Sequence, residues 1–287
     1  MPIMIEFNYF SKFWVEGRLK LEFFDSHAHY NDEKFNEDRE EIIEKIYNAD
    51  ITKFISAGYS LESSKKGIEL AEKYDYIYTT SGISPNDVKE SIEETQKDID
   101  ELKKLIIEYK RGKKEKDKLV GIGEIGLDYY WNKENKEIQK YAFIEQIKLA
   151  NEMNLPIAIH TREAVMDTLE ILKQNPVNKK GVFHCCPFNR ELVKEALKLG
   201  FYISIAGPVT FKNSKNAPEI IDMIPIDRML IETDSPYLAP EPVRGTRNDS
   251  RNVKYTAQKI AELKGLTIEE VAEATYRNAE KLYNIEE

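Results

Sequence analysis

A pair of histidines, His27 and His29, follows a short apolar run at residues 21–24. In a β-strand, residues two apart lie on the same face, so both imidazoles would point to one side and could chelate a metal ion. In a helix the same two side chains would diverge, so the metal interpretation requires the apolar run to be a strand. It also requires further ligands elsewhere in the chain.

The chain has four histidines in all, and each lies at or just beyond the end of an apolar run: His27, His29, His160 and His184. A single histidine at such a position is usually structural. Because all four histidines lie at the ends of apolar runs, one shared metal site is favoured over four separate structural roles.

Two carboxylates complete this set of candidate ligands. Glu124 lies in Gly-Ile-Gly-Glu-Ile-Gly-Leu-Asp at 121–128, where glycines permit close approach of neighbouring backbone or of a ligand. Asp234 follows an apolar run, where an ionised carboxylate is unfavourable unless it is paired or bound to a cation. Four imidazoles and two carboxylates exceed the needs of one tetrahedral ion with an open position. They predict two divalent ions with Glu124 placed to bridge them.

A two-metal site of this kind is suited to hydrolysis. Two neighbouring divalent ions lower the pKa of a bound water, hold the attacking and leaving oxygens, and stabilise the charge of the transition state. Asp234 would bind one ion and accept the proton of the water, so the expected catalytic residues are Asp234 and Glu124. Nitrogen and oxygen ligands are compatible with Zn, Mg, Mn or Co, and their spacing does not choose among these metals.

Short apolar runs alternate with longer amphipathic segments along the chain, a pattern that favours an α/β fold, a closed (β/α)8 TIM barrel. Active sites of such barrels lie at the C-terminal ends of the strands, and each candidate ligand lies at such an end. The expected strands are residues 21–26, 53–57, 77–81, 119–124, 156–160, 181–184, 202–206 and 229–232. The expected helices are residues 37–48, 61–73, 92–110, 134–153, 163–173, 191–198, 218–224, 252–264 and 267–283.

Length and composition predict one domain. With 287 residues and 41% hydrophobic content, the chain can form one complete barrel at residues 21–287. Residues 1–20 form an extension of unknown role that lacks the features of a signal peptide. The net charge of −9 disfavours indiscriminate binding of nucleic acid, although it allows a local basic patch.

The adjacent cysteines Cys185 and Cys186 cannot form an ordinary structural disulfide. Their pattern predicts a reducing compartment, and we expect a cytoplasmic protein. No apolar run approaches the length of a membrane span, so no membrane association is expected. The sequence gives no indication of an obligatory protein partner.

Five motifs in order along residues 22–287 resemble the TatD-type metal-dependent deoxyribonucleases of the amidohydrolase superfamily. They are His-Ala-His at 27–29, Gly-Glu-Ile-Gly-Leu-Asp-Tyr-Tyr at 123–130, Ile-His-Thr-Arg at 159–162, His-Cys at 184–185 and Glu-Thr-Asp-Ser-Pro-Tyr-Leu-Ala-Pro at 232–240. The resemblance implies hydrolysis of DNA phosphodiesters, often as a 3′ exonuclease, with DNA as the substrate. It implies one metal held by His27, His29, Glu124 and Asp234, and another held by Glu124, His160 and His184.

Substrate contacts are expected from arginines near the strand ends. Arg162 lies two residues beyond His160, and Arg244, Arg247 and Asn248 follow the last strand in a segment that the resemblance also covers. Guanidinium groups there could clamp a phosphate, and the alternative is a salt bridge to a neighbouring loop. The aromatic residues 129–131 could stack on a base, but aromatic residues on such loops serve as often in packing.

The sequence departs from the family pattern in places that concern the substrate. Ser84 stands where the family usually has a histidine, Cys-Cys-Pro-Phe at 185–188 replaces a small glycine-containing turn, and Asp-Ser at 249–250 replaces Glu-Pro. The alternative function is therefore a metal-dependent ester or amide hydrolase, such as a D-aminoacyl-tRNA deacylase. A non-catalytic metal-binding protein would be expected to lack a ligand or the water-activating acid, and this chain has both. Residues 121–127 include no lysine that could be carboxylated to bridge the metals, as in other barrel hydrolases.

Overall fold

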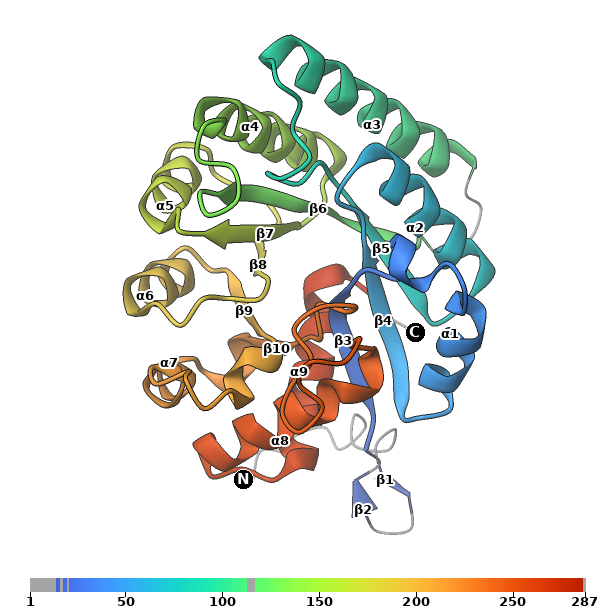
Figure 1. Ribbon diagram of the computed structural model, residues 1–287, viewed down its shortest axis with the longest axis vertical. Helices are drawn as coiled ribbons and strands as arrows, with labels where there is room; N and C mark the ends of the chain where they lie inside the picture. The colour runs from blue at the N-terminus through green and yellow to red at the C-terminus, as the bar shows by residue number, and fades with distance from the viewer. Residues whose placement is uncertain (1–13, 16–17, 20, 113–116, 286–287) are drawn as a thin grey trace, which may run out of the picture.

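The computed structural model describes residues 14–15, 18–19, 21–112 and 117–285. Eight parallel strands, hydrogen-bonded in chain order, form a nearly closed barrel, which confirms the predicted (β/α)8 fold (Figure 1). The strands are β3 (Phe23–Ala28), β4 (Ile51–Ala57), β5 (Ile77–Ser81), β6 (Leu119–Asp128), β7 (Ile157–Arg162), β8 (Gly181–Phe183), β9 (Tyr202–Ile205) and β10 (Met229–Ile231).

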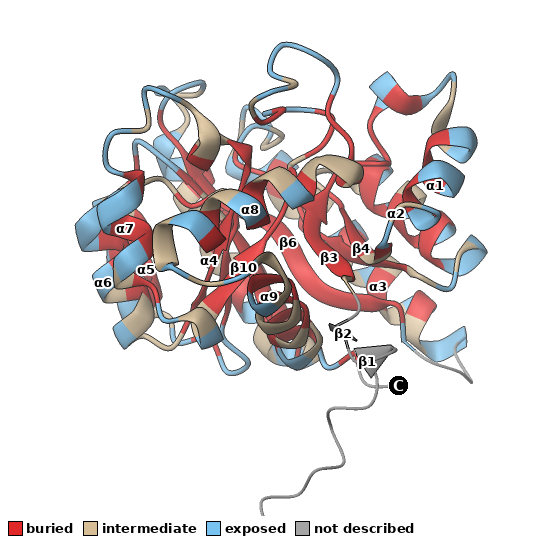
Figure 2. Ribbon diagram, turned by 90° about the horizontal axis from the view of Figure 1, so that it is seen from below, coloured by how far each residue is buried: buried red, intermediate tan, exposed pale blue. Residues whose placement is uncertain are grey.

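Helices surround the strands and bury one face each against them, so that exposed residues lie mainly on the outside of the ring (Figure 2). Serine and threonine side chains begin two of these helices with capping boxes, Ser60 with Ser63 and Thr267 with Glu270. The helices are α1 (Arg39–Tyr47), α2 (Leu61–Lys73), α3 (Ile92–Gly112), α4 (Lys136–Met153), α5 (Val165–Gln174), α6 (Arg190–Lys198), α7 (Ala217–Met223), α8 (Val253–Lys264) and α9 (Ile268–Tyr283). Short 3₁₀ turns are η1 (Glu33–Phe35), η2 (Gly207–Thr210), η3 (Ile226–Arg228) and η4 (Ser250–Asn252).

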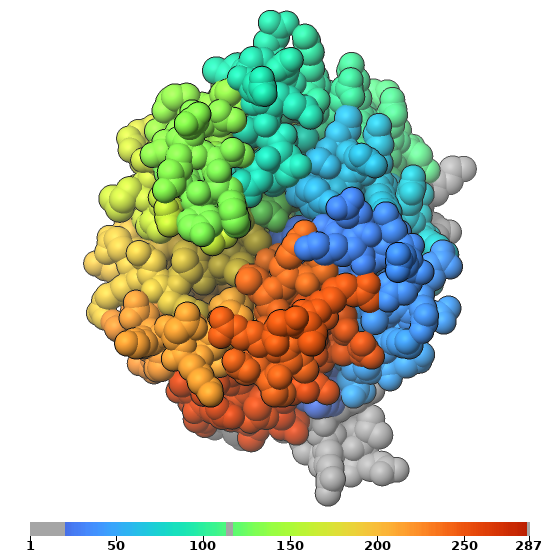
Figure 3. Space-filling model, viewed as in Figure 1, coloured from blue at the N-terminus to red at the C-terminus, as the bar shows by residue number. Residues whose placement is uncertain are grey.

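The barrel interior has its own apolar core, to which every one of the eight strands contributes one side chain. These side chains pack on α9, which thereby closes the N-terminal end of the barrel. The opposite end, where the strands finish, stays open and is hollowed near its centre (Figure 3). The strand residues are Phe24, Ile55, Tyr78, Val120, Ala158, Val182, Tyr202 and Leu230, and α9 contributes Tyr276, Ala279, Leu282 and Tyr283.

A buried carboxylate, Asp25 on β3, joins the first barrel strand to the segment that follows the last strand, β10. It accepts hydrogen bonds from the backbone nitrogen of Thr233 at 3.0 Å, from the Thr233 hydroxyl at 2.5 Å and from the Ser250 hydroxyl at 2.6 Å. Burial raises the pKa of Asp25 to about 7, against the opposing effect of these hydrogen bonds. Beside it, the backbone nitrogen of Asp234 donates to the carbonyl of His27 at 2.9 Å. This junction holds two of the candidate ligands next to each other.

Replacing Asp25 with alanine is expected to lower the free energy of unfolding by about 2–4 kcal/mol, because the donors of Thr233 and Ser250 then lose their buried acceptor. Urea unfolding followed by circular dichroism measures the change. The control is Asp222→Ala on the exposed surface of α7, which should change stability by less than about 0.5 kcal/mol. Equal stability of the two variants would show that Asp25 does not hold this junction.

Two expectations concern the ends of the chain and its relation to membranes. Most of the extension at residues 1–20 lies outside the described residues, and its role stays a prediction. Within it, β1 (Trp14–Val15) and β2 (Arg18–Leu19) pair in antiparallel fashion.

Across the described ranges, the structure contains no helix with the length and apolar character needed to cross a membrane.

Candidate metal centre

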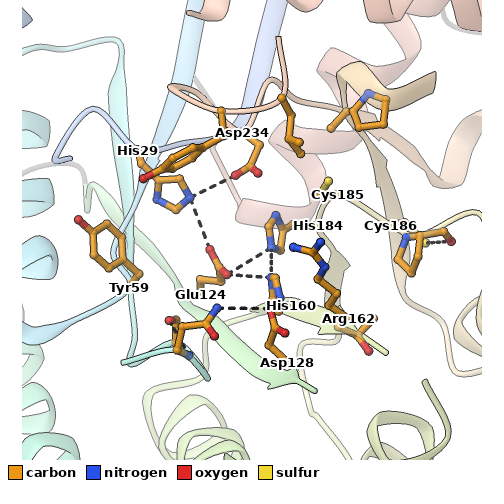
Figure 4. A pocket seen from close by; sticks show the side chains of 18 of the residues that line it. His29, Tyr59, Glu124, Asp128, His160, Arg162, His184, Cys185, Cys186 and Asp234 are labelled. Atoms are coloured by element: carbon orange, nitrogen blue, oxygen red, sulfur yellow. Dashed lines mark hydrogen bonds and ion pairs between the residues drawn. The ribbon is translucent and has the colours of Figure 1, made fainter. Parts of the chain in front are cut away.

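The six predicted metal ligands lie together at the C-terminal ends of the strands. All of them except His27, which lies behind His29 and Glu124 in contact with both, line a cavity of about 740 Å³ (Figure 4). They come from five different strands or the loops directly after them, as expected for the active end of such a barrel. The six are His27 and His29 around the end of β3, Glu124 on β6, His160 on β7, His184 after β8 and Asp234 after β10.

One group of donor atoms gathers around an oxygen of Glu124. The Nε2 atoms of His27 and His29 lie 3.2 Å apart, and they are 3.3 Å and 3.5 Å from Oε2 of Glu124. Oδ1 of Asp234 lies 3.2 Å from Nε2 of His29 and 3.9 Å from Nε2 of His27. Two ring nitrogens and two carboxylate oxygens therefore converge on one small space.

A second group gathers around the other oxygen of the same carboxylate. Oε1 of Glu124 lies 3.0 Å from Nδ1 of His160 and 3.5 Å from Nε2 of His184. These two ring nitrogens are 3.1 Å apart. Glu124 thus lies between the two groups and presents one oxygen to each, as Figure 4 shows for its labelled neighbours.

The chemistry of these donors fits divalent cations. A ring nitrogen must be unprotonated to bind a metal, and burial lowers the pKa of His27. Burial alone would also lower the pKa of His184, but Glu124 and Glu232 outweigh it and raise that pKa well above its usual value. The carboxylates thus favour a positive charge at this position, and a bound cation would supply that charge in place of the proton.

Two histidines are held at their second ring nitrogen by an oxygen, and a third, His184, has a carboxylate oxygen nearby. Nδ1 of His29 lies 3.0 Å from the carbonyl of Ala57, and Nε2 of His160 lies 3.0 Å from Oδ2 of Asp128. Nδ1 of His184 lies 3.4 Å from Oε1 of Glu232. Such partners fix the tautomer and orientation of a metal-binding imidazole.

Sequence reasoning did not assign a role to Asp128 or Glu232. Both lie inside motifs that were singled out for their neighbours, Asp128 four residues after Glu124 and Glu232 two residues before Asp234. A carboxylate at that spacing in the same strand end is the signal that could have identified them.

Asp128→Asn is expected to weaken metal retention by about 10–100-fold, because an amide holds His160 in its metal-binding orientation less strongly than a carboxylate does. Competition with a chelator, followed by metal analysis, measures the loss. Asp167→Asn serves as the control, since Asp167 lies on the neighbouring α5 and bonds Tyr129 and Lys140 instead. Parent-like retention in Asp128→Asn would contradict the orienting role.

Comparison with known proteins identifies the family to which this chain belongs. The sequence profile of the family described as "TatD related DNase" matches residues 24–284. The chain belongs to the TatD family. It is 43% identical over 263 residues to YabD of Bacillus subtilis, covering 91% of this chain and 99% of that protein, which is named as an uncharacterized metal-dependent hydrolase. It is 35% identical over 266 residues to YcfH of Escherichia coli, which carries the same description, covering 91% of this chain and 96% of YcfH.

A solved structure agrees with this assignment to the TatD family of metal-dependent hydrolases. The crystal structure of YJJV, a TatD homologue from Escherichia coli, superposes with a TM-score of 0.83 at 25% sequence identity. The superposition covers 92% of this chain and 98% of YJJV.

The glycines of the TatD-like motif on β6 allow this strand to lie against β7. A Cβ at Gly126, where φ is +141°, would lie 2.0 Å from the carbonyl oxygen of His160. A Cβ at Gly123 would lie 2.6 Å from the Cβ of Ala158 and 2.8 Å from its carbonyl oxygen. Any side chain there would push apart the strands that carry Glu124 and His160, so glycine is required at both positions.

Arg162 is the expected substrate residue that lines the cavity. Its guanidinium lies 3.9 Å from the ring centre of Tyr130 and 5.5 Å from that of Trp131. Among the described residues, no carboxylate pairs with this guanidinium, so its donors are available to a ligand.

The other expected substrate residues lie away from the cavity lining. Arg247 pairs with both oxygens of Asp38, which is the alternative role considered from the sequence. Arg244 lies 4.1 Å from the ring centre of Phe211 on an exposed loop. Asn248 is buried, and its amide donates to backbone carbonyls, one of them Thr233 at 3.0 Å.

Two of the three departures from the TatD pattern are found at the cavity wall, whereas Asp249 and Ser250 lie outside its lining. Ser84 lines it and donates a hydrogen bond to Asp87 at 2.6 Å. Cys185 and Cys186 also line it, and Cys185 adopts a positive φ of 38° while its backbone nitrogen donates to Glu232 at 2.7 Å. These changes alter the surface that a substrate meets and leave the six candidate ligands in place.

Proposed function

We propose that this TatD-family protein hydrolyses phosphodiester bonds of DNA, using two divalent cations. The supporting observation is the position of Glu124, whose two oxygens face two separate groups of donor atoms. One cation would be held by His27, His29, Glu124 and Asp234, and the other by Glu124, His160 and His184. Zn, Mg, Mn or Co would satisfy these donors.

When bound, such a cation pair lowers the pKa of an attacking water and stabilises negative charge on the phosphate. Asp234 accepts the proton of that water at a carboxylate oxygen. Burial alone would raise the pKa of Asp234, but the neighbouring histidines, with His29 first among them, outweigh it and lower this pKa. Asp234 is therefore ionised near neutral pH and free to act as a base.

Arg162 is the expected phosphate contact, because it lines the same cavity as Glu124 and no carboxylate of the described residues pairs with its guanidinium. Its stacking on Tyr130 restricts the side chain before a substrate arrives, which reduces the entropy lost on binding. The family description, "TatD related DNase", supports a DNA substrate. Arg244, Arg247 and Asn248 would then act by holding the loop after β10 at the edge of the site.

Metal analysis of protein purified without chelator is expected to give about two ions per chain, because the six ligands form two groups that share Glu124. Plasma emission spectrometry on dialysed protein measures this ratio. One tightly held ion, with no second ion binding on titration, would contradict the two-metal proposal.

The substrate is tested by a screen of one metal-reconstituted preparation against single-stranded DNA, duplex DNA, RNA and small esters. Asp234→Asn serves as the blank in every arm. Metal-dependent cleavage of DNA that disappears in the blank is the expected result. Cleavage of esters alone would show that the substrate is not DNA.

A second candidate function is hydrolysis of an ester or amide that carries an amino group, as in an aminoacyl ester. Two further carboxylates, Asp32 and Asp87, line the cavity beside the metal ligands. They would repel a phosphate but attract an ammonium group. Faster hydrolysis of an aminoacyl ester than of its uncharged N-acetyl form would favour this function.

A further inference from the structure

An exposed aromatic residue, Trp131, lines the cavity of the candidate metal centre, where its ring contacts Tyr130 and Arg162. Its side chain is 67% exposed, although it lines the cavity together with Glu124 and Arg162. Tryptophan is enriched at binding interfaces because its ring gives a large apolar contact area. The ring therefore offers a flat face to a ligand.

This ring belongs to a small ordered cluster. Trp131 meets Tyr130 edge to face, with ring centres 4.8 Å apart and an interplanar angle of 88°. The guanidinium of Arg162 covers Tyr130 at 3.9 Å, so Tyr130 and Arg162 support the indole from one side. A supported ring loses little conformational entropy when a ligand binds to it.

Asp128 ties this cluster to the metal centre. Its Oδ1 accepts hydrogen bonds from the backbone nitrogens of Tyr130 at 2.9 Å and Trp131 at 3.0 Å. Its Oδ2 lies 3.0 Å from Nε2 of His160. One carboxylate therefore holds both a candidate metal ligand and the backbone of the aromatic pair, which fixes the position of the indole relative to the site of hydrolysis.

We propose that Trp131, supported by Tyr130 and Arg162, is a stacking platform for an unpaired nucleobase and selects single-stranded polynucleotide over duplex. This inference rests on the proposed phosphodiesterase function and names the part of the substrate that the site recognises. A base within a duplex already has both faces covered by its neighbours, whereas a base in a single strand has a face to offer. Stacking of this kind is tolerant of base identity, so no sequence preference is expected.

The test uses binding of two phosphorothioate chains that resist hydrolysis: a short oligodeoxythymidine and the same chain with abasic sugars. The chain has two tryptophans, so a Trp14→Phe background makes the fluorescence report on Trp131 alone. Metal-loaded protein is expected to bind the base-containing chain about tenfold more tightly than the abasic chain. Only the base-containing chain should quench the fluorescence of Trp131.

In the parent background, Trp131→Ala is expected to abolish the difference in affinity, and Trp131→Phe should retain part of it. The matched control is Tyr47→Ala, which removes an exposed aromatic ring that stacks on Tyr76 at the other end of the barrel. That variant should keep the full difference. A blunt duplex should bind no better than the abasic chain.

The proposal is overturned if both chains bind the parent equally, if the base-containing chain leaves the fluorescence unchanged, or if the difference persists in Trp131→Ala. Hydrolysis of ordinary DNA by the same preparation is measured separately. Quenching without DNA hydrolysis would refute the phosphodiesterase function while supporting the platform. DNA hydrolysis with no effect of the bases on binding would support the phosphodiesterase function and refute the stacking platform.

Discussion

Asp234→Asn is expected to lower kcat for the metal-dependent reaction by at least about 10³-fold. The amide keeps an oxygen near His29, but it cannot accept the proton of the attacking water and it binds a cation less strongly than a carboxylate does. Initial rates with saturating metal separate these two effects, because added metal restores occupancy without restoring the base. The loss should therefore persist at every metal concentration.

The control for this variant is Asp167→Asn, which makes the same chemical change on α5 outside the two groups of candidate ligands. Its rate should stay within about twofold of the parent, as expected for a substitution outside the site. Near-ultraviolet circular dichroism verifies that both variants fold. A parent-like rate for Asp234→Asn would remove this aspartate from the proton transfer.

Glu124→Gln is expected to have the second large effect, because it disrupts both groups of donors at once. A neutral amide cannot bridge two cations, so metal content should fall from about two ions per chain to below one. Hydrolysis should fall by at least about 10³-fold in parallel. Thermal unfolding with and without added metal gives a second measurement, since a cation that binds only the folded protein raises its midpoint.

His160→Ala provides the comparison that makes this result specific. His160 belongs to the second group alone, so this variant should lose one ion and keep the other. Glu124→Gln should lose more metal than His160→Ala. Two retained ions in Glu124→Gln would refute the proposed bridging position of this carboxylate.

Much of the fold follows from sequence periodicity, because a buried parallel strand needs a short apolar run and its crossover helix needs an amphipathic one. The boundaries are less well determined. The first barrel strand begins at Phe23 instead of residue 21, and β6 continues to Asp128, beyond its predicted end at residue 124. The extra residues of β6 pair with the end of β7, a long-range contact that periodicity within one segment does not encode.

The candidate site was likewise predictable from the sequence only in part. The six candidate ligands could be grouped from the sequence because each lies at or just after the end of a predicted strand, and these ends meet at one rim of the barrel. The contacts of Asp128 and Glu232 depend on side-chain rotamers, and the pairing of Arg247 with Asp38 joins loops at opposite ends of the chain. Neither spacing nor composition predicts such contacts.

Among the described residues, α9 closes the N-terminal end of the barrel, and the cavity opens at the opposite end. The apolar layer that includes Phe24 and Leu230 blocks the N-terminal end of the barrel. A substrate therefore cannot pass through the molecule, and its products must leave through the opening by which the substrate entered. Product and fresh substrate then compete for the same passage. Under the proposed phosphodiesterase function, a released nucleotide should therefore act as a competitive inhibitor, and turnover should slow as it accumulates.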